Sequence, residues 1–317
     1  MTVVVLPFPA QRVLAADIAV LLEAHGFESR VGRLDWRRFP DGESLVAVDE
    51  VIDGADVILL ASLRDPDAMA LALRYAAATA REFGARSVGL VAPYLAYMRQ
   101  DTRFHPGEAI SAPLFAGFLE ESFDWLTAVD PHLHRIPTLD AVFRIPTRCV
   151  AAAPAVAGWI RDTVTDPVLI GPDGESGQWV ADIASRAGLP YQVLSKQRSG
   201  DRDVQVSLPE PGLLRRRTPV IVDDIISTGQ TIVEAMRHLS AAGLRPATCV
   251  TIHAVFAEDA YETLLAAGAA RVVSTDTIPH ASNAIPLAPL LAEATADLLL
   301  AGSKVRATGN RSPRIDT

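Results

Sequence analysis

Short apolar runs alternate with stretches of helical periodicity along the whole chain. In the first half, four apolar runs predict buried strands, at residues 3–6, 56–61, 87–91 and 125–129. Between them, apolar residues recurring every three or four positions predict helices at 11–25, 68–83 and 111–121. Gly26 and Gly84 stand where helices commonly end. Such alternation is typical of parallel sheets covered by helices, so an α/β fold is expected.

A second series of similar size follows a break near residues 145–152. It predicts strands at 167–171, 191–195, 219–222, 247–252 and 271–274. The helices predicted with them lie at 153–162, 178–187, 232–242 and 259–267. We therefore expect two domains, at 1–147 and 148–286, and a C-terminal helix within 287–301. The segment 302–317 is rich in Ser, Gly, Arg and Pro and is expected to be a disordered tail.

Composition narrows the class of protein. Nearly half of the 317 residues are apolar (49%), enough for two sizeable cores, yet no apolar run reaches the roughly 18 residues that span a bilayer. The net charge of −9 argues against nucleic acid as a partner. Anionic ligands would need local donors and metal ions. Cys149 and Cys249 suggest neither a disulfide framework nor a zinc site, and a cytoplasmic location is expected.

The most informative motif lies at residues 220–231. An apolar run ends in Asp223 and Asp224, and the small, hydroxyl-rich loop Ser227–Thr231 leads into a helix. Exposed backbone N–H groups at a helix start favour phosphate, and the hydroxyls of Ser227, Thr228 and Thr231 are potential caps. The two carboxylates would face sugar hydroxyls or a divalent cation instead. Together with Gly229 and Gln230, this resembles the phosphoribosyl-diphosphate (PRPP) binding motif of type I phosphoribosyltransferases.

Two further segments of the second half could carry chemistry. A glycine-rich loop at 171–177 precedes a helix, and its Asp173 is either a magnesium ligand or the cap of a turn. Lys196 and Arg198 lie in a charged segment that is either a solvated hairpin or a pair of cations closing over a phosphate. Parallel sheets place ligands beyond the carboxyl ends of their strands, where both segments are expected.

The first half contains groups suited to a purine nucleotide. Phe39-Pro-Asp41-Gly-Glu43 and Tyr97-Met-Arg99-Gln100-Asp101 combine aromatic, guanidinium, amide and carboxylate groups, which can stack on a base and bond its edge. Each segment alone is more typical of a turn or a solvated helix end. His132 follows Asp130 beyond a strand end, as a structural residue, a metal ligand or a hydrogen-bond donor.

The order and spacing of these motifs resemble the ribose-phosphate diphosphokinase (PRPP synthetase) family, and the motif sequences are most similar to those of its archaeal-type members. The resemblance covers residues 35–300. It implies two phosphoribosyltransferase type I-like domains, with the last helix packing back on the first domain. It also implies a homo-oligomer built from dimers, in which Phe39, Asp41 and Glu43 often serve a neighbouring subunit.

The resemblance assigns a role to each candidate residue. ATP would be held by Phe39, Asp41, Glu43, Arg99, Gln100, Asp101 and His132. Ribose 5-phosphate would be held by Asp173, Asp223, Asp224, Ser227, Thr228, Gly229, Gln230 and Thr231. Mg²⁺ would be bound by His132 and Asp173, and Lys196 and Arg198 would be catalytic. The implied products are PRPP and AMP.

Two alternatives share part of this pattern. A PRPP-consuming phosphoribosyltransferase would share residues 220–231 but not the nucleotide motifs of the first half. A non-catalytic regulatory subunit is the other, because Gly174-Glu175-Ser176 departs from the more glycine-rich family pattern. Glu175 beside a pyrophosphate would be unfavourable unless it points away or meets Mg²⁺.

Overall fold

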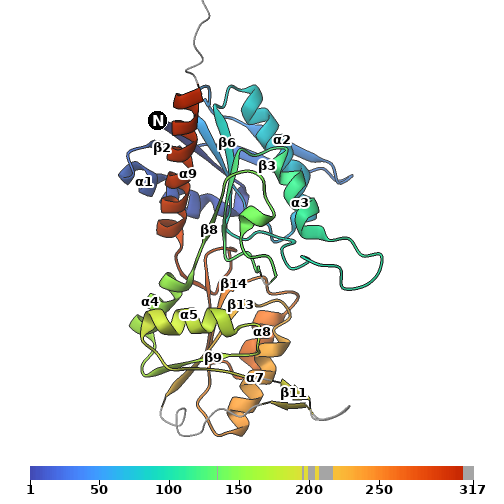
Figure 1. Ribbon diagram of the computed structural model, residues 1–317, viewed down its shortest axis with the longest axis vertical. Helices are drawn as coiled ribbons and strands as arrows, with labels where there is room; N and C mark the ends of the chain where they lie inside the picture. Colours follow the sequence, from blue (N-terminus) through green and yellow to red (C-terminus); the bar gives the residue numbers. More distant parts are fainter. Residues whose placement is uncertain (134, 195, 199–203, 207–216, 310–317) are drawn as a thin grey trace, which may run out of the picture. The chain divides into compact units, whose positions relative to one another are not determined.

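The computed structural model describes the chain except residues 134, 195, 199–203, 207–216 and 310–317 (Figure 1). The chain forms two compact units. Unit 1 comprises Met1–Val150 and Ala288–Thr317, and unit 2 comprises Ala151–Leu287. Along the part of the chain that is described, no helix combines the length and apolar character needed to cross a membrane.

Unit 1 is built on a six-stranded parallel sheet in the order β2-β1-β5-β6-β7-β8. Its strands are β1 (Thr2–Pro7), β2 (Glu28–Val31), β5 (Asp56–Leu60), β6 (Ser87–Ala92), β7 (Trp125–Val129) and β8 (Thr147–Val150). Every residue of the central strands β5, β6 and β7 is buried, because both faces of the sheet are covered. An antiparallel hairpin of β3 (Leu34–Arg38) and β4 (Ser44–Val48) is separate from this sheet.

Helices cover both faces of the sheet in unit 1. Buried residues of α2 (Pro66–Glu82) and α3 (Ser111–Glu120) share one hydrophobic cluster with alternate residues of the strands. The helices α1 (Arg12–Ala24) and α9 (Ala288–Gly309) pack against each other, and α9 also contacts β7 and β8 (Figure 1). The 3-10 turns η1 (Pro9–Gln11) and η2 (Leu139–Ala141) complete the unit.

Unit 2 repeats this architecture with a sheet in the order β10-β9-β13-β14-β15-β16, again parallel. Its strands are β9 (Pro167–Gly171), β10 (Tyr191–Val193), β13 (Thr218–Ile225), β14 (Thr248–His253), β15 (Arg271–Thr275) and β16 (Asn283–Ile285). The helices α7 (Gln230–Ala241) and α8 (Ala260–Ala266) share a core cluster with the sheet. The helices α4 (Ala153–Thr163) and α5 (Gly177–Ala187) pack together, and α5 contacts β9 and β13. The short strands β11 (Lys196–Arg198) and β12 (Val204–Val206) pair antiparallel.

The expected α/β class and parallel sheets are confirmed, with three differences in the extent of elements. The strand predicted at 219–222 continues to Ile225 as β13, because β14 pairs with it through Asp223 and Ile225. The last helix continues to Gly309, through part of the segment expected to be a disordered tail. The strands β2, β3, β4, β8 and β16 were not predicted, since each is short and only partly buried.

Candidate functional site

A loop between β13 and α7 leaves an array of donors exposed in unit 2. Helix α7 begins after Gly229, which has φ +73°, a conformation that favours glycine. The N-cap residue Gly229 provides no side-chain cap, and the hydroxyls of Ser227, Thr228 and Thr231 bond to no described residue. The first backbone N–H groups of α7 and these hydroxyls are therefore available to an anion.

The segment after β14 holds this loop from behind. The N–H of Ile226 donates to the carbonyl of His253 (3.3 Å), and the carbonyl of Ser227 accepts from Ala257 (3.0 Å). The carbonyl of Ile226 also accepts from Phe256 (2.9 Å), which packs against Tyr261 with 5.6 Å between ring centroids. The backbone of the loop is thus fixed, while the hydroxyls of its side chains have no hydrogen-bond partner among the described residues.

Three carboxylates lie at the same edge of the sheet in unit 2. Burial, together with the charges of Asp224 and Asp173, raises the pKa of Asp223 to about 8. Asp224 is buried within β13, and its Oδ1 accepts the N–H of Ile225 at 2.9 Å. Within the described ranges, no three acidic, His or Cys groups are arranged to hold a metal ion. A cation here would therefore need ligand atoms from a substrate.

Asp173 caps the turn that begins α5. Its Oδ1 accepts the N–H groups of Glu175 (3.0 Å) and Ser176 (3.1 Å), which is the cap considered from the sequence. Ser176 is buried, and its hydroxyl donates to the carbonyl of Asp173 at 2.6 Å. Glu175 is exposed. The turn fixes the position of the Asp173 carboxylate, whose charge reaches Asp223.

A buried polar network behind Asp224 was missed by the sequence analysis. The hydroxyl of Thr251 donates to the carbonyl of Asp224 at 3.2 Å, and the Nδ1 of His253 bonds the hydroxyl of Thr277 at 3.0 Å. Thr251, His253 and Thr277 are fully buried, as is Thr275, whose hydroxyl donates to the carbonyl of Ile252 at 2.6 Å. Polar residues at the ends of two apolar runs are the signal that could have indicated this network.

In unit 1, the segment after β6 presents a cation. Arg99 is exposed, and its guanidinium makes no hydrogen bond or ion pair to the described residues. Gln100 is held at the start of α3, because its Oε1 accepts from the hydroxyl of Ser111 (2.6 Å) and its carbonyl accepts from Ala112 (3.1 Å). The ring of Tyr97 packs against Phe115 with 4.7 Å between ring centroids.

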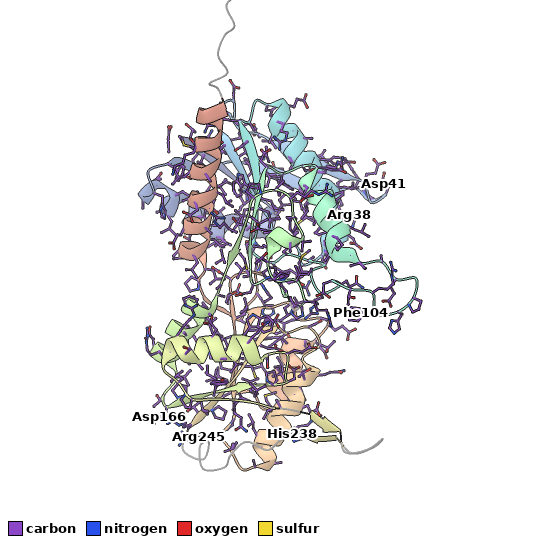
Figure 2. All side chains as sticks on the ribbon, in the orientation of Figure 1. Arg38, Asp41, Phe104, Asp166, His238 and Arg245 are labelled. Carbon is purple, nitrogen blue, oxygen red and sulfur yellow. The ribbon has the colours of Figure 1, made fainter. Side chains whose placement is uncertain are left out.

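The motif 39–43 forms the turn of the β3–β4 hairpin. The N–H of Phe39 donates to the carbonyl of Glu43 (2.7 Å), and the guanidinium of Arg37 lies over the Phe39 ring at 4.5 Å. Asp41 and Glu43 are exposed, and Asp41 lies at the end of the hairpin in Figure 2. Their carboxylates therefore face solvent in unit 1 taken alone.

Asp101 and His132 differ from Arg99 in being held within unit 1. The carboxylate of Asp101 is buried (2% exposed) and pairs with Arg135 at 2.8 Å. The guanidinium of Arg135 lies 5.4 Å from the ring centroid of Phe104, which Figure 2 places on the loop before α3. His132 has φ +51°, and its N–H donates to the carbonyl of Asp130 at 2.7 Å. Arg135 is a neighbour of the motif that the sequence analysis missed.

Lys196 and Arg198 lie on β11, and the expected cationic segment therefore has a described backbone. The side chains of both residues, and residues 199–203 after them, lie outside the part of the chain that the structure describes. Their expected role stays a prediction.

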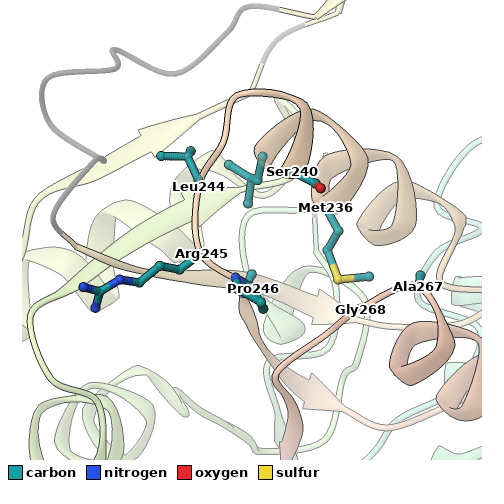
Figure 3. Close-up of a pocket in the computed structure, with 9 residues that line it drawn as sticks. Met236, Ser240, Leu244, Arg245, Pro246, Ala267 and Gly268 are labelled. Atoms are coloured by element: carbon teal, nitrogen blue, oxygen red, sulfur yellow. The ribbon is translucent and has the colours of Figure 1, made fainter.

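A separate cavity lies at the opposite edge of the sheet in unit 2. Its volume is about 170 Å³, and it is lined by Met236, Leu239, Pro246 and Gly268, among others. Ala247 of this cavity directly precedes β14, which places it at the amino ends of the strands (Figure 3). Figure 3 shows the guanidinium of Arg245 directed away from it. This cavity is therefore distinct from the carboxyl edge that carries the candidate site.

Two family models match most of the chain. The model of the N-terminal domain of ribose phosphate pyrophosphokinase matches residues 3–122, and the phosphoribosyl transferase domain matches residues 141–289. Both halves of the expected resemblance are thus confirmed.

Relatives extend the match over nearly the full length of known proteins. The ribose-phosphate pyrophosphokinase of Methanopyrus kandleri is 34% identical over 87% of this chain and 94% of its own length. That of Methanothermobacter thermautotrophicus is 32% identical over 91% and 98%. The crystal structure of phosphoribosylpyrophosphate synthetase from Mycobacterium smegmatis superposes with a TM-score of 0.80, at 25% identity, covering 95% of this chain and all of the other.

Proposed function

Because the chain belongs to the ribose-phosphate pyrophosphokinase family, we propose that it makes PRPP and AMP from ATP and ribose 5-phosphate. The 1-hydroxyl of the sugar attacks the β-phosphorus, a new O–P bond forms, and the bond to the AMP oxygen breaks. The hydroxyl proton passes to solvent. In such transfers, catalysis consists mainly of positioning and charge stabilisation.

The uncommitted loop of unit 2 is the observation that carries the sugar-phosphate half of the proposal. The start of α7 and the hydroxyls of Ser227, Thr228 and Thr231 offer donors to the 5-phosphate, and Gly229 lets the backbone turn close to it. Gln230 is exposed at the first helical position beside them. Asp223 and Asp224 then accept from the ribose hydroxyls.

The carboxylates of unit 2 are suitable Mg²⁺ ligands, but within the described residues they are too few to hold the ion without substrate atoms. Burial, and then the charges of Asp224 and Asp173, raise the pKa of Asp223, and a nearby cation would favour its charged form. Mg²⁺ usually binds through one or two carboxylates together with substrate phosphates, which suits Asp173 as a proposed ligand in unit 2. His132 is the ligand proposed in unit 1. When bound, the ion neutralises charge on the phosphate oxygens. Such neutralisation is needed because a protein of net charge −9 repels anionic substrates.

Unit 1 supplies the proposed nucleotide side. Arg99 is an exposed cation without a described partner, and Gln100 is fixed next to it. Phe39, Asp41 and Glu43 on the exposed hairpin turn would complete the ATP site, as would Asp101 through its pair with Arg135. Lys196 and Arg198 would stabilise the transferring group. We further propose a dimer-based homo-oligomer in the cytoplasm, without nucleic-acid or membrane partners.

The test is ³¹P NMR of the purified protein with Mg²⁺, ATP and ribose 5-phosphate. We expect AMP together with a sugar 1-diphosphate. Formation of ADP would overturn the proposed position of attack. No product in that mixture, followed by turnover only when PRPP and a nucleobase are supplied, would instead indicate a PRPP-consuming transferase. Inactivity in both mixtures would indicate a non-catalytic subunit.

A further inference from the structure

Tyr97 has a backbone conformation that calls for an explanation. Its φ is +68°, in the left-handed region that residues other than glycine rarely adopt. Residues are held there only when their surroundings determine the conformation, and such residues are common at functional sites. Tyr97 precedes Arg99 by two positions, so the contacts of Tyr97 set how the chain enters the proposed nucleotide segment.

Contacts to two helices determine the conformation of Tyr97. Its hydroxyl donates to the carboxylate of Asp67, in the first turn of α2. Its ring packs against Phe115 of α3, and its carbonyl accepts the N–H of Gln100 at 3.2 Å. The hydrogen bond to Asp67 raises the pKa of Tyr97 above its ordinary value of 10.

The same segment is fixed a second time at Gln100. The side chain and carbonyl of Gln100 bond Ser111 and Ala112 at the start of α3. Arg99 lies between these two anchors, exposed and without a described partner. A cation on an anchored segment needs less ordering when it meets its ligand, and preorganisation of this kind raises affinity.

We propose that Tyr97, through its hydrogen bond to Asp67, is a positioning residue that presents Arg99 to the nucleotide. This inference rests on the proposed function, because it takes ATP as the ligand of Arg99. Tyr97 itself need not touch the nucleotide, since both its ring and its hydroxyl are engaged within unit 1. Its loss should change nucleotide affinity and leave the use of the sugar phosphate unchanged.

The first test is Tyr97→Phe, which removes only the hydroxyl. We expect KM for ATP, and Kd for ATP from calorimetry, to rise by up to about tenfold, because the segment that carries Arg99 must then be ordered when ATP binds. KM for ribose 5-phosphate should stay within about twofold of the original value, because that ligand is bound by unit 2. Tyr75→Phe is the matched control, since the hydroxyl of Tyr75 on α2 bonds to no described residue.

Changes at Asp67 test the partner of the hydrogen bond. Asp67→Asn keeps an oxygen acceptor and should remain near the original KM, whereas Asp67→Ala should match Tyr97→Phe. The double variant Tyr97→Phe, Asp67→Ala should be no worse than either single variant, because both remove one interaction.

Three results would overturn the positioning role. They are an unchanged KM for ATP in Tyr97→Phe, a parallel rise in both KM values with a lower melting temperature, and additive effects in the double variant. Absence of PRPP synthesis by the unmodified protein would instead overturn the proposed function, so the two failures are distinguishable.

Discussion

At the scale of single residues, Asp223 has a pKa in the folded chain that differs strongly from its ordinary value. It is a carboxyl group with an ordinary pKa of 3.8, and in the folded chain burial, Asp224 and Asp173 raise that pKa to about 8. Between these two values the unfolded chain releases a proton that the folded chain retains. Stability is therefore unaffected below pH 3.8, falls as the pH rises through this window, and levels off above pH 8.

We predict that Asp223→Asn stabilises unit 2 in alkaline solution. The amide removes the ionisable group, so the free energy of unfolding at pH 8.5 should increase by about 1–3 kcal/mol. The gain should be much smaller at pH 4. Urea unfolding at both pH values provides the measurement, and Asp259→Asn on the exposed surface is the control. Equal gains at the two pH values would contradict the raised pKa.

The same variant should use ribose 5-phosphate poorly. That result would show that the residue that lowers stability at alkaline pH is also needed for the proposed function. Active sites commonly retain groups that lower stability, because binding requires them. Sequence alone indicated Asp223 as a candidate but not its pKa. That value depends on Asp173, which is 50 positions away in the sequence and comes close only through the pairing of β9 with β13.

At the scale of elements, the close packing of β6 against β7 depends on a single glycine. A Cβ on Gly89 would come within 2.0 Å of the Trp125 ring, and both residues lie in central strands of unit 1. The indole fills the space that a side chain would occupy. A shift of either strand would disturb the sheet pairing on both of its sides.

We predict that Gly89→Ala destabilises the protein by about 3 kcal/mol through overpacking. Gly117→Ala on α3 is the matched control, because no atom lies within 4 Å of the Cβ it would add. That control should be neutral or slightly stabilising, since alanine favours helices over glycine by about 1 kcal/mol. Thermal unfolding compares the two variants, and similar melting temperatures would show that the sheet adapts.

The elements also show what periodicity can and cannot predict. The long strands and helices of both units were predicted because their apolar residues recur regularly, as in β7 and α5. The hairpin β3–β4 was missed, although its turn at 39–43 was singled out for its chemistry, because its strands are only partly buried. In the same way, motif spacing indicated Arg99 and Ser227, while their supports Tyr97 and His253 depend on contacts between distant segments.

At the scale of the whole molecule, unit 1 is assembled from two separate parts of the chain. Its sheet lies within residues 1–150, and α9 returns from position 288 to pack on α1, β7 and β8. Leu291, Leu298 and Leu299 are nearly fully buried. Burial of each leucine contributes about 2 kcal/mol, so together they are comparable with the stability of a typical domain.

We predict that ending the chain after Leu287 unfolds unit 1. Ending it after Lys304 should leave the melting temperature within about 2 °C of the original, because every α9 residue named above as buried is retained. Hydrogen exchange can follow the two units separately. Rapid exchange of the β5 and β6 amides should accompany the shorter chain, with unit 2 amides still protected. Continued protection of β5 and β6 would contradict a structural requirement for α9.

The discontinuity of unit 1 has a consequence for how the protein is made. A ribosome releases the chain from its N-terminus at about 5–20 residues per second, and domains generally fold as they emerge. The whole of unit 2 lies before α9 in the sequence, so it can fold while unit 1 still lacks its last helix. Until that helix appears, the apolar surface on β7, β8 and α1 is open to chaperones. The part of the enzyme that is synthesised first is therefore the part completed last.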